Sequence, residues 1–259
     1  MKGPKGCGAK PLTATHGNGV HQALPPLMEY HWDRSAGSVL PSDCRRLVIV
    51  GAGGFGREVL QWARDSWPDY ASRIAGFLSD DARRLDGFST GLTILGPVAS
   101  YEKLPGDYLL LGIGVAYSRR MVAERLTARG AEFVTLVHPT AVVAESARMG
   151  RGSIVCPGAI VSDSATLGEC VLMNYYASLG HDASAGDFAV LSPYATLGGG
   201  ATVGHDVFLG LHASVGPGRS VGARSKVSAN SCVLSDTPAD SIIYGVPGRI
   251  VPRVEVARS

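Results

Sequence analysis

Hydrophobic and polar residues repeat every six positions between His138 and Val233. Divided from His138, this segment gives sixteen hexapeptides, among them GECVLM, GDFAVL and GHDVFL. The sixth place is Val, Leu or Met in every hexapeptide but one, where it is Ala185, and the first place is Gly in nine. Neither an α-helix, with a period of about 3.6, nor a half-buried strand, with a period of about 2, produces this repeat. A stack of short strands joined by regular corners does, so the pattern predicts a parallel β-solenoid.

Each place in the hexapeptide has a predicted role. The aliphatic sixth residue fills the interior, and the small fourth residue, usually Ala or Ser, also points inward. Gly at the first place suits a corner with tight backbone geometry. Three sides of six residues give coils of eighteen residues, so residues eighteen apart are expected to stack, and the segment makes a little over five coils.

The residues before the repeat predict alternating strands and helices. Apolar runs at residues 47–50, 74–78 and 108–111 predict three strands, and residues 132–137 predict a fourth. Helical patterns stand between the first two strands and before the last. This βαβ order predicts a small parallel, Rossmann-like α/β sheet. About ninety residues hold only one mononucleotide-binding half, which argues against an NAD domain.

The chain is therefore expected to have three parts: an N-terminal arm over 1–44, an α/β domain over 45–136, and the solenoid with a closing segment over 137–259. The arm has no period and is rich in Gly, Pro and His. One interpretation is a flexible arm or leader, and the other is a segment that docks on the body through Tyr30 and Trp32.

A glycine-rich turn follows the first predicted strand. The sequence from Gly51 to Gly56 is GAGGFG, and a helical run begins there. Backbone N–H groups and a helix N-terminus at such a turn can hold a phosphate. The second strand ends in Ser79, Asp80 and Asp81, where a nucleotide-binding sheet often contacts ribose or base. A tight turn without a ligand is the alternative.

Composition narrows the class of protein. The formal net charge is +2, and Lys and Arg are scattered, so no nucleic-acid partner is expected. Apolar runs are too short to span a bilayer, and the N-terminus lacks a secretory pattern, so no membrane partner is expected. The five cysteines have no metal-site spacing, which predicts no metal site and fits a reducing cytoplasm.

A resemblance to one family rests on three features: the GAGGFGREV opening of the small domain, the hexapeptide repeat joined directly to it, and the ending at residues 235–248 with its Gly-x-Pro turn. Together these resemble the sugar O- and N-acyltransferases of sialic acid and bacterial nucleotide-amino-sugar pathways, over about residues 45–252. The resemblance implies a left-handed β-helix, a homotrimer and acetyl-CoA as co-substrate. It also implies that the small domain binds the nucleotide of the sugar, with the following candidate residues: Gly51, Gly53, Gly56, Asp80 and Asp81.

The choice of a catalytic base rests on stacking. His181 and His205 both occur as Gly-His-Asp, but they are twenty-four residues apart and therefore lie on different edges. One and two coils beyond His181 stand the glycine-rich triplets 198–200 and 216–218, whereas 222–224 stand beyond His205. A bare edge can form a slot for coenzyme A. We therefore expect His181 to be the general base, as the family's catalytic His aligns there.

The other candidates follow from this choice. Asp182, or Asp163 one coil below, is expected to orient the imidazole. Gly199 is the candidate for a main-chain contact to the thioester carbonyl, and the acetyl-CoA slot is completed by three further glycines: Gly200, Gly216 and Gly218. The alternative is a surface histidine at a corner, for which His205 is the better candidate.

Two departures and three alternatives stay open. Relatives often have a second His nine residues after the base, where this chain has Val190, and often have Glu where this chain has Asp182. The preferred function is acetyl transfer to the amino group of a nucleotide-linked amino sugar. The alternatives are O-acetylation of a free sugar such as a sialic acid, a zinc hydratase, for which the histidine spacing fits poorly, and a non-catalytic scaffold. Tyr176, Tyr194 and His212 are expected to stack at a subunit contact.

Overall fold

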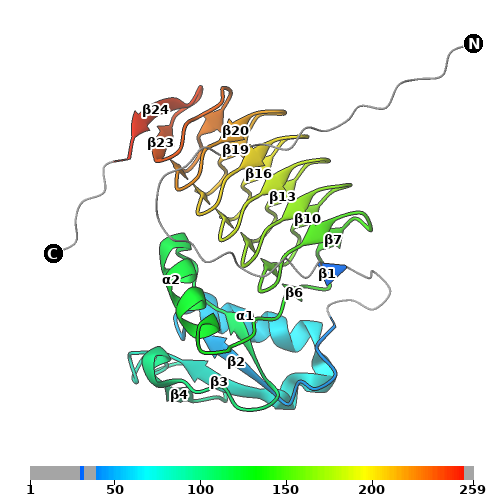
Figure 1. Cartoon of the computed structure of the whole chain (residues 1–259), viewed down its shortest axis with the longest axis vertical. Coiled ribbons are helices and arrows are strands. Elements are labelled where there is room, and N and C mark those ends of the chain that lie inside the picture. The colour runs from blue at the N-terminus through cyan, green and yellow to red at the C-terminus, as the bar shows by residue number, and fades with distance from the viewer. Residues whose placement is uncertain (1–29, 32–38, 254–259) are drawn as a thin grey trace, which may run out of the picture.

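The computed structural model describes residues 30–31 and 39–253. The α/β domain packs against the first coils of a long solenoid (Figure 1). The arm predicted over residues 1–44 is described only at β1 (Tyr30–His31) and from residue 39 onward. β1 pairs antiparallel with the solenoid strand β8. Trp32, the second proposed docking residue, lies outside the described residues.

The α/β domain is a four-stranded parallel sheet in the order β4-β3-β2-β5. Its strands are β2 (Arg46–Val50), β3 (Ile74–Leu78), β4 (Ile94–Gly96) and β5 (Asp107–Leu111). Its helices are α1 (Gly54–Ser66) and α2 (Ala116–Thr127), with short 3-10 turns η1 (Pro68–Arg73) and η2 (Val98–Ser100). Leu47 and Ile49 face α1, and Val48 and Val50 face α2, so one helix covers each side of the sheet.

The fourth strand of this sheet differs from the prediction. Residues 132–137 supply only an isolated bridge between Phe133 and Leu109, after which β6 (Leu136–Val137) already belongs to the solenoid. The prediction was wrong because a short apolar run looks the same in a buried sheet and in a β-coil. The actual fourth strand, β4, was missed because it is three residues long and only half-buried.

The solenoid places one two-residue strand at the fifth and sixth places of each hexapeptide, so that three parallel sheets form the sides of a triangular prism. Side 1 consists of β7 (Val142–Val143), β10 (Ile160–Val161), β13 (Ser178–Leu179), β16 (Thr196–Leu197), β19 (Ser214–Val215) and β22 (Cys232–Val233). Side 2 consists of β8 (Arg148–Met149), β11 (Thr166–Leu167), β14 (Ser184–Ala185), β17 (Thr202–Val203) and β20 (Ser220–Val221). Side 3 consists of β6, β9 (Ile154–Val155), β12 (Leu172–Met173), β15 (Val190–Leu191), β18 (Phe208–Leu209), β21 (Lys226–Val227), β23 (Ser241–Tyr244) and the antiparallel β24 (Arg249–Pro252).

The eighteen-residue stacking is confirmed. Leu172 pairs with Val190, and Val190 pairs with Phe208, which are successive steps of eighteen. Sixth-place residues from Val143 to Val233 and fourth-place alanines form one buried cluster along the axis. The last coil breaks the step, because Lys226 pairs with Ile242, sixteen residues on.

The corners work differently from the prediction. The left-handed backbone conformation falls at the third place, as at Asp182, Asp206 and Gly200, and not at the first. First-place glycines are needed for another reason. A Cβ on Gly180 would lie 2.7 Å from the backbone N of Gly199, and one on Gly186 would lie 2.7 Å from that of His205. The first-place Gly therefore permits close contact with the next coil.

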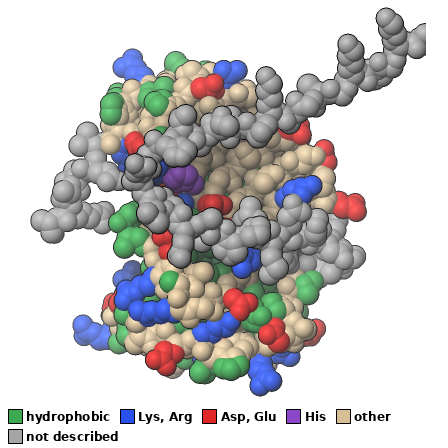
Figure 2. Space-filling model, viewed as in Figure 1, with side chains coloured by type: hydrophobic (Ala, Val, Ile, Leu, Met, Phe, Trp, Pro, Cys, Tyr) green, Lys and Arg blue, Asp and Glu red, His purple; other side chains and the backbone are tan. Residues whose placement is uncertain are grey.

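Side 3 carries the α/β domain. Its outward residues Ile154, Leu172 and Val190 are buried in one cluster with α1. Trp62 of α1 packs edge-on against Tyr175, with ring centroids 5.2 Å apart. The visible solenoid face in Figure 2 is largely tan, meaning that few hydrophobic or charged side chains cover it. The α/β domain therefore covers side 3, while sides 1 and 2 meet at a corner away from that domain.

Candidate active site

His181 lies at the corner between β13 and β14, where sides 1 and 2 meet. Its Nδ1 is 2.8 Å from Oδ2 of Asp182, and both side chains are exposed. A carboxylate at Nδ1 favours the tautomer with its proton there, which leaves Nε2 as the basic nitrogen. His181 and Asp182 therefore have the arrangement of a base and its orienting acid.

The glycine edge stands directly beside this histidine. A Cβ on Gly199 would lie 2.5 Å from Nε2 of His181, so the ring occupies space that only glycine leaves. The Gly200 N–H donates to the His181 carbonyl at 2.8 Å, and the Gly218 N–H donates to the Gly199 carbonyl at 2.9 Å. Among the described residues, the Gly199 N–H donates to no backbone carbonyl. The Gly199 backbone and Nε2 of His181 therefore lie side by side.

The other slot glycines lie on the same edge. Gly200 and Gly218 both have φ of +65°, and a Cβ on either would meet open space. Gly216 lies against the Val233 carbonyl. Asp163, the other proposed orienting residue, is one coil below and accepts a hydrogen bond from Ser146 Oγ at 2.5 Å. The carboxylate that contacts the imidazole is that of Asp182.

The second Gly-His-Asp motif has a different environment. His205 Nδ1 is 2.7 Å from Asp206, but that carboxylate also accepts two contacts from Arg120 Nε of α2, at 2.7 and 2.8 Å. The Asp206 side chain is only 13% exposed, against 65% for Asp182. Asp206 thus connects the solenoid to the α/β domain, which supports His181 as the base.

The glycine-rich turn joins β2 to α1. Gly51 has φ of +102°, and a Cβ there would lie 2.8 Å from the Gly112 carbonyl. A Cβ on Gly56 would lie 1.8 Å from the Gly51 carbonyl, so this turn closes only with glycine. Gly53 caps α1 without a side-chain bond, and the first turn of α1 has no acidic residue. The backbone N–H groups at the start of α1 therefore have no side-chain cap, and such groups suit an anion.

Asp80 and Asp81 follow β3, at the same edge of the sheet as this turn. Oδ1 of Asp80 accepts a hydrogen bond from the Val98 N–H at 2.9 Å, and Oδ1 of Asp81 accepts one from the Arg83 N–H at 3.0 Å. Both residues are exposed. The structure therefore brings the nucleotide-side candidates together at one sheet edge. It does not bring them to His181, because their domain packs on side 3.

No group of three or more metal-ligating side chains is found within the described part of the chain. Nor does any helix of the described residues have the length and apolarity to span a membrane.

Comparisons with known proteins match both parts of the chain. Residues 46–126 match the PglD N-terminal domain family. UDP-N-acetylbacillosamine N-acetyltransferase of Bacillus subtilis (strain 168) is 33% identical over 118 residues, or 43% of this chain. The chain spans about half the length of that curated relative, 51%.

Two solved structures extend the likeness across the solenoid. A mutant of perosamine N-acetyltransferase from Caulobacter crescentus, in complex with CoA and GDP-perosamine, has a TM-score of 0.70 and 27% identity, covering 80% of this chain and 96% of that one. The acetyltransferase domain of PglB from Neisseria gonorrhoeae, in complex with acetyl coenzyme A, has a TM-score of 0.72 and 27% identity, covering 80% and 100%. Across both of its domains, the chain is therefore similar to sugar N-acetyltransferases. The predicted architecture, an α/β domain followed by a left-handed β-helix, is confirmed.

The structure gives a physical reason for one departure from the resembling family noted in the sequence. Val190, where relatives often have a second histidine, is 2% exposed and packs with α1 and the neighbouring strands of side 3. An imidazole there would be buried among apolar groups without a clear partner. Within one chain Val190 lies on a different side from His181, so it serves domain packing.

Sequence reasoning missed the residues that join the two domains. Arg119 of α2 is fully buried and donates to the carbonyls of Leu111, Ile113 and Cys170, and burial lowers its pKa to about 10. A signal was present in the sequence. From Ile154 to Phe208, every third hexapeptide has an apolar fifth place, where most others have Ser or Thr; Lys226 ends this pattern.

Proposed function

We propose that this protein transfers an acetyl group from acetyl-CoA to the amino group of a nucleotide-linked amino sugar, with His181 as general base. The observation that carries the proposal is the exposed His181 ring, with Nδ1 at Asp182 and Nε2 against Gly199. Support comes from relatives in complex with CoA and GDP-perosamine or with acetyl coenzyme A. These relatives favour N-acetylation over O-acetylation of a free sugar.

The residues fit each step of this reaction. The sugar amine attacks the thioester carbonyl while Nε2 of His181 takes its proton. The carbonyl oxygen becomes negative, and the Gly199 N–H is the proposed donor to it. The C–S bond then breaks, and the imidazolium returns the proton to the departing thiolate. The new C–N bond completes the amide, and Asp182 stabilises the imidazolium throughout.

The two substrates are assigned to different parts of the chain. The edge with Gly199, Gly200, Gly216 and Gly218 is proposed to hold acetyl-CoA. The turn with Gly51, Gly53 and Gly56, with Asp80 and Asp81 beside it, is proposed to hold the nucleotide. Because these two sites lie on different faces, we propose a homotrimer in which neighbouring chains complete each active site.

A cytoplasmic location belongs to the same proposal. Cys44, Cys156, Cys170 and Cys232 are all unpaired thiols, which suits a reducing compartment. Burial raises the pKa of Cys44, Cys156 and Cys170 and keeps these thiols protonated.

The test is an acetyl-transfer assay with purified protein, acetyl-CoA and a panel of nucleotide-linked amino sugars. The His181→Asn substitution should lower kcat by about 10²- to 10⁴-fold. The matched control is His205→Asn, which changes the same motif at the other edge and should retain most turnover. Equal losses in both variants, or a loss confined to His205→Asn, would reject His181 as the base. Turnover only with free sugars would reject the proposed acceptor.

A further inference from the structure

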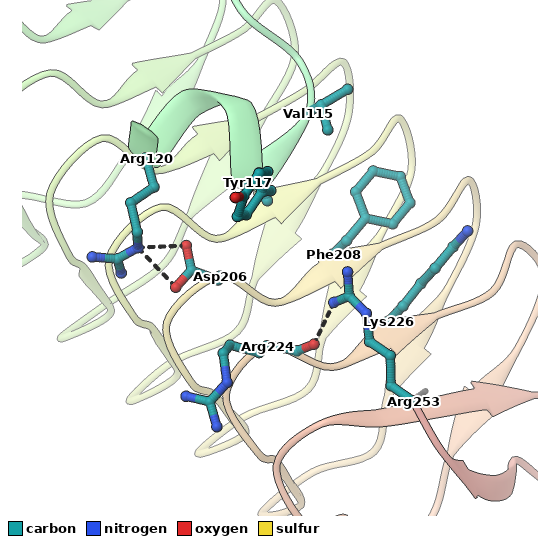
Figure 3. A pocket seen from close by; sticks show the side chains of 9 residues that line it. Val115, Tyr117, Arg120, Asp206, Phe208, Arg224, Lys226 and Arg253 are labelled. Atoms are coloured by element: carbon teal, nitrogen blue, oxygen red, sulfur yellow. Dashed lines mark hydrogen bonds and ion pairs between the residues drawn. The ribbon is translucent and has the colours of Figure 1, made fainter. Parts of the chain in front are cut away.

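A cavity of about 440 Å³ lies between the start of α2 and the upper part of side 3 (Figure 3). Val115, Ala116 and Tyr117 form its wall on the α/β domain. The solenoid wall consists of Asp206, Phe208, Arg224, Lys226 and, after β24, Arg253. Arg120 of α2 also lines the cavity and bonds to Asp206 across the junction. This volume lies in the range of small-ligand sites.

Two of the four cations in this cavity are already neutralised. Arg120 forms an ion pair with Asp206 through Nε. Arg224 forms an ion pair with Asp240, with its Nε and Nη2 at 2.7 and 2.5 Å from the two carboxylate oxygens. The hydrogen bonds from Arg224 lower the pKa of Asp240, so this carboxyl stays ionised as its partner. These pairs fix the frame of the cavity.

Lys226 and Arg253 are the remaining cations. Within the described ranges, neither forms an ion pair with a carboxylate. The Lys226 ammonium lies 5.8 Å from the Phe208 ring centroid, and the Arg253 guanidinium donates to the Arg224 carbonyl at 2.5 Å. Figure 3 shows both side chains extending from the solenoid beside Phe208. The cavity therefore has two cations without an ion-paired carboxylate among the described residues, of which Arg253 also interacts electrostatically with Asp240, and both lie next to aromatic and apolar surface.

The cavity wall begins at the residue that follows the loop beside the proposed nucleotide-binding edge. Val115 directly follows residues 112–114, and the Gly112 carbonyl is the group that the glycine-rich turn contacts at Gly51. The loop that leads into the cavity wall therefore also lies against the glycine-rich turn. Val115 and Tyr117 are 62% and 64% exposed, which leaves the cavity wall accessible.

We propose that this cavity binds the diphosphate group of a nucleotide, with Lys226 and Arg253 as the phosphate-binding side chains and Tyr117 and Phe208 as the surface for its less polar part. Two cations match the charge of a diphosphate, and both Lys and Arg bind phosphate through charge-assisted hydrogen bonds. The inference rests on the proposed function, in which both substrates carry a nucleoside diphosphate. Its wall on the α/β domain, formed by the start of α2, favours the sugar nucleotide over the acetyl donor.

The test is calorimetric titration of the whole protein with UDP, GDP and CoA, each alone. The double variant Lys226→Gln/Arg253→Gln should bind one of these ligands about 10- to 100-fold more weakly and bind the others with unchanged affinity. Arg249→Gln is the matched control, because it removes one positive charge from β24 outside the cavity. Loss of UDP or GDP binding assigns the cavity to the sugar nucleotide, and loss of CoA binding assigns it to the acetyl donor.

Two results would contradict the cavity inference. If the wild type binds a nucleotide and the double variant binds it as tightly, the cavity inference fails while the proposed function stands. If the wild type binds none of the three, both fail. Lys226 is exposed, so the single variant Lys226→Gln provides the same comparison should the double variant unfold.

Discussion

At the scale of single residues, the position of His181 depends on what Gly199 lacks. The imidazole lies where a Cβ on Gly199 would stand, 2.5 Å from Nε2. The contact with Asp182 comes from the next residue in the same corner, in the left-handed conformation at φ +59°. The third place of the hexapeptide thus turns the carboxylate toward its neighbour, and the coil above leaves room for the ring.

Gly199→Val tests this arrangement. The side chain would displace the imidazole, and a shift of about 1 Å in a catalytic group can cost ~100-fold in rate. We expect kcat to fall by about that factor and the melting temperature to change little, since valine is acceptable in a β-coil. Steady-state kinetics and thermal unfolding provide the measurements. Ala223→Val, at the equivalent place one coil beyond His205, is the control and should keep its rate; unchanged kinetics for Gly199→Val would remove this edge from the active site.

At the scale of elements, the first-place glycines decide how closely coils approach. Gly210 is an example that lies away from both candidate sites. A Cβ on Gly210 would lie 2.6 Å from the backbone N of Ala229 in the next coil. Gly200, at a third place, has a left-handed backbone but open space around it. The two positions therefore separate crowding from backbone strain.

Gly210→Ala should cost about 2–3 kcal/mol of unfolding free energy, because neighbouring coils must move apart. Gly200→Ala should cost about 1 kcal/mol or less, since the left-handed penalty is partly offset by a less flexible unfolded chain. Urea unfolding of both variants measures the difference. A larger loss at Gly200 would mean that the third place, and not the first, limits the coil.

The contact between α2 and the solenoid is the second feature at this scale. Arg120→Leu would leave Asp206 without its main partner and should destabilise the protein by about 1.5–3 kcal/mol. Arg125→Leu, on the same helix but exposed, is the matched control and should be nearly neutral. Chemical denaturation with a probe on each domain would show whether the loss affects the junction; identical midpoints for both variants would contradict the role of this ion pair.

Elements also show how far sequence reasoning reaches. The solenoid and the neighbours of His181 could be predicted because each place in the hexapeptide has one role and the register is fixed by counting. β4 and the assignment of residues 132–137 could not, because short apolar runs do not identify their sheet. The apolar fifth places of side 3 indicated a covered side, but the roles of Arg119 and Asp206 could not be predicted, since they depend on how two separately patterned domains pack.

At the scale of the whole molecule, the two proposed substrate sites lie on different sides of one chain. The corner at His181 is formed by sides 1 and 2, and the glycine-rich turn belongs to the domain on side 3. The aromatic ladder is a further exposed feature. Tyr176 stacks on Tyr194 at 5.1 Å, and Tyr194 stacks on His212 at 4.7 Å, as expected from the eighteen-residue step. Its place at a subunit contact stays a prediction.

Light scattering should show a trimer at concentrations where the protein is active. If neighbouring chains share a site, mixing unfolded His181→Asn with Gly56→Val and refolding them together should restore part of the activity that each lacks alone. Refolding each variant by itself is the control. Activity in a monomeric fraction, or no recovery in mixed trimers that bind both substrates, would contradict shared sites.

Alkaline pH should destabilise the fold through buried thiols. Burial raises the pKa of Cys170 from 9.0 to about 12 in the folded chain. The unfolded thiol ionises first, so the stability is complete below pH 9 and is lost as pH rises toward 12, by up to ~1.4 kcal/mol per pH unit for this group. Unfolding free energies measured across this range should fall less steeply in Cys170→Ala than in the control Cys232→Ala. Equal slopes would contradict the shift.

The eighteen-residue register also limits which changes in gene length this protein can survive. Duplication of a whole coil would lengthen the prism and return every later residue to its own side. Gain or loss of a single hexapeptide between His181 and Gly199 would keep all strands well formed, yet carry every later residue to the next side of the prism. The fold would tolerate both events, but only the first leaves each side of the molecule with its own residues, so lineages of such proteins should vary in length by coils more readily than by hexapeptides.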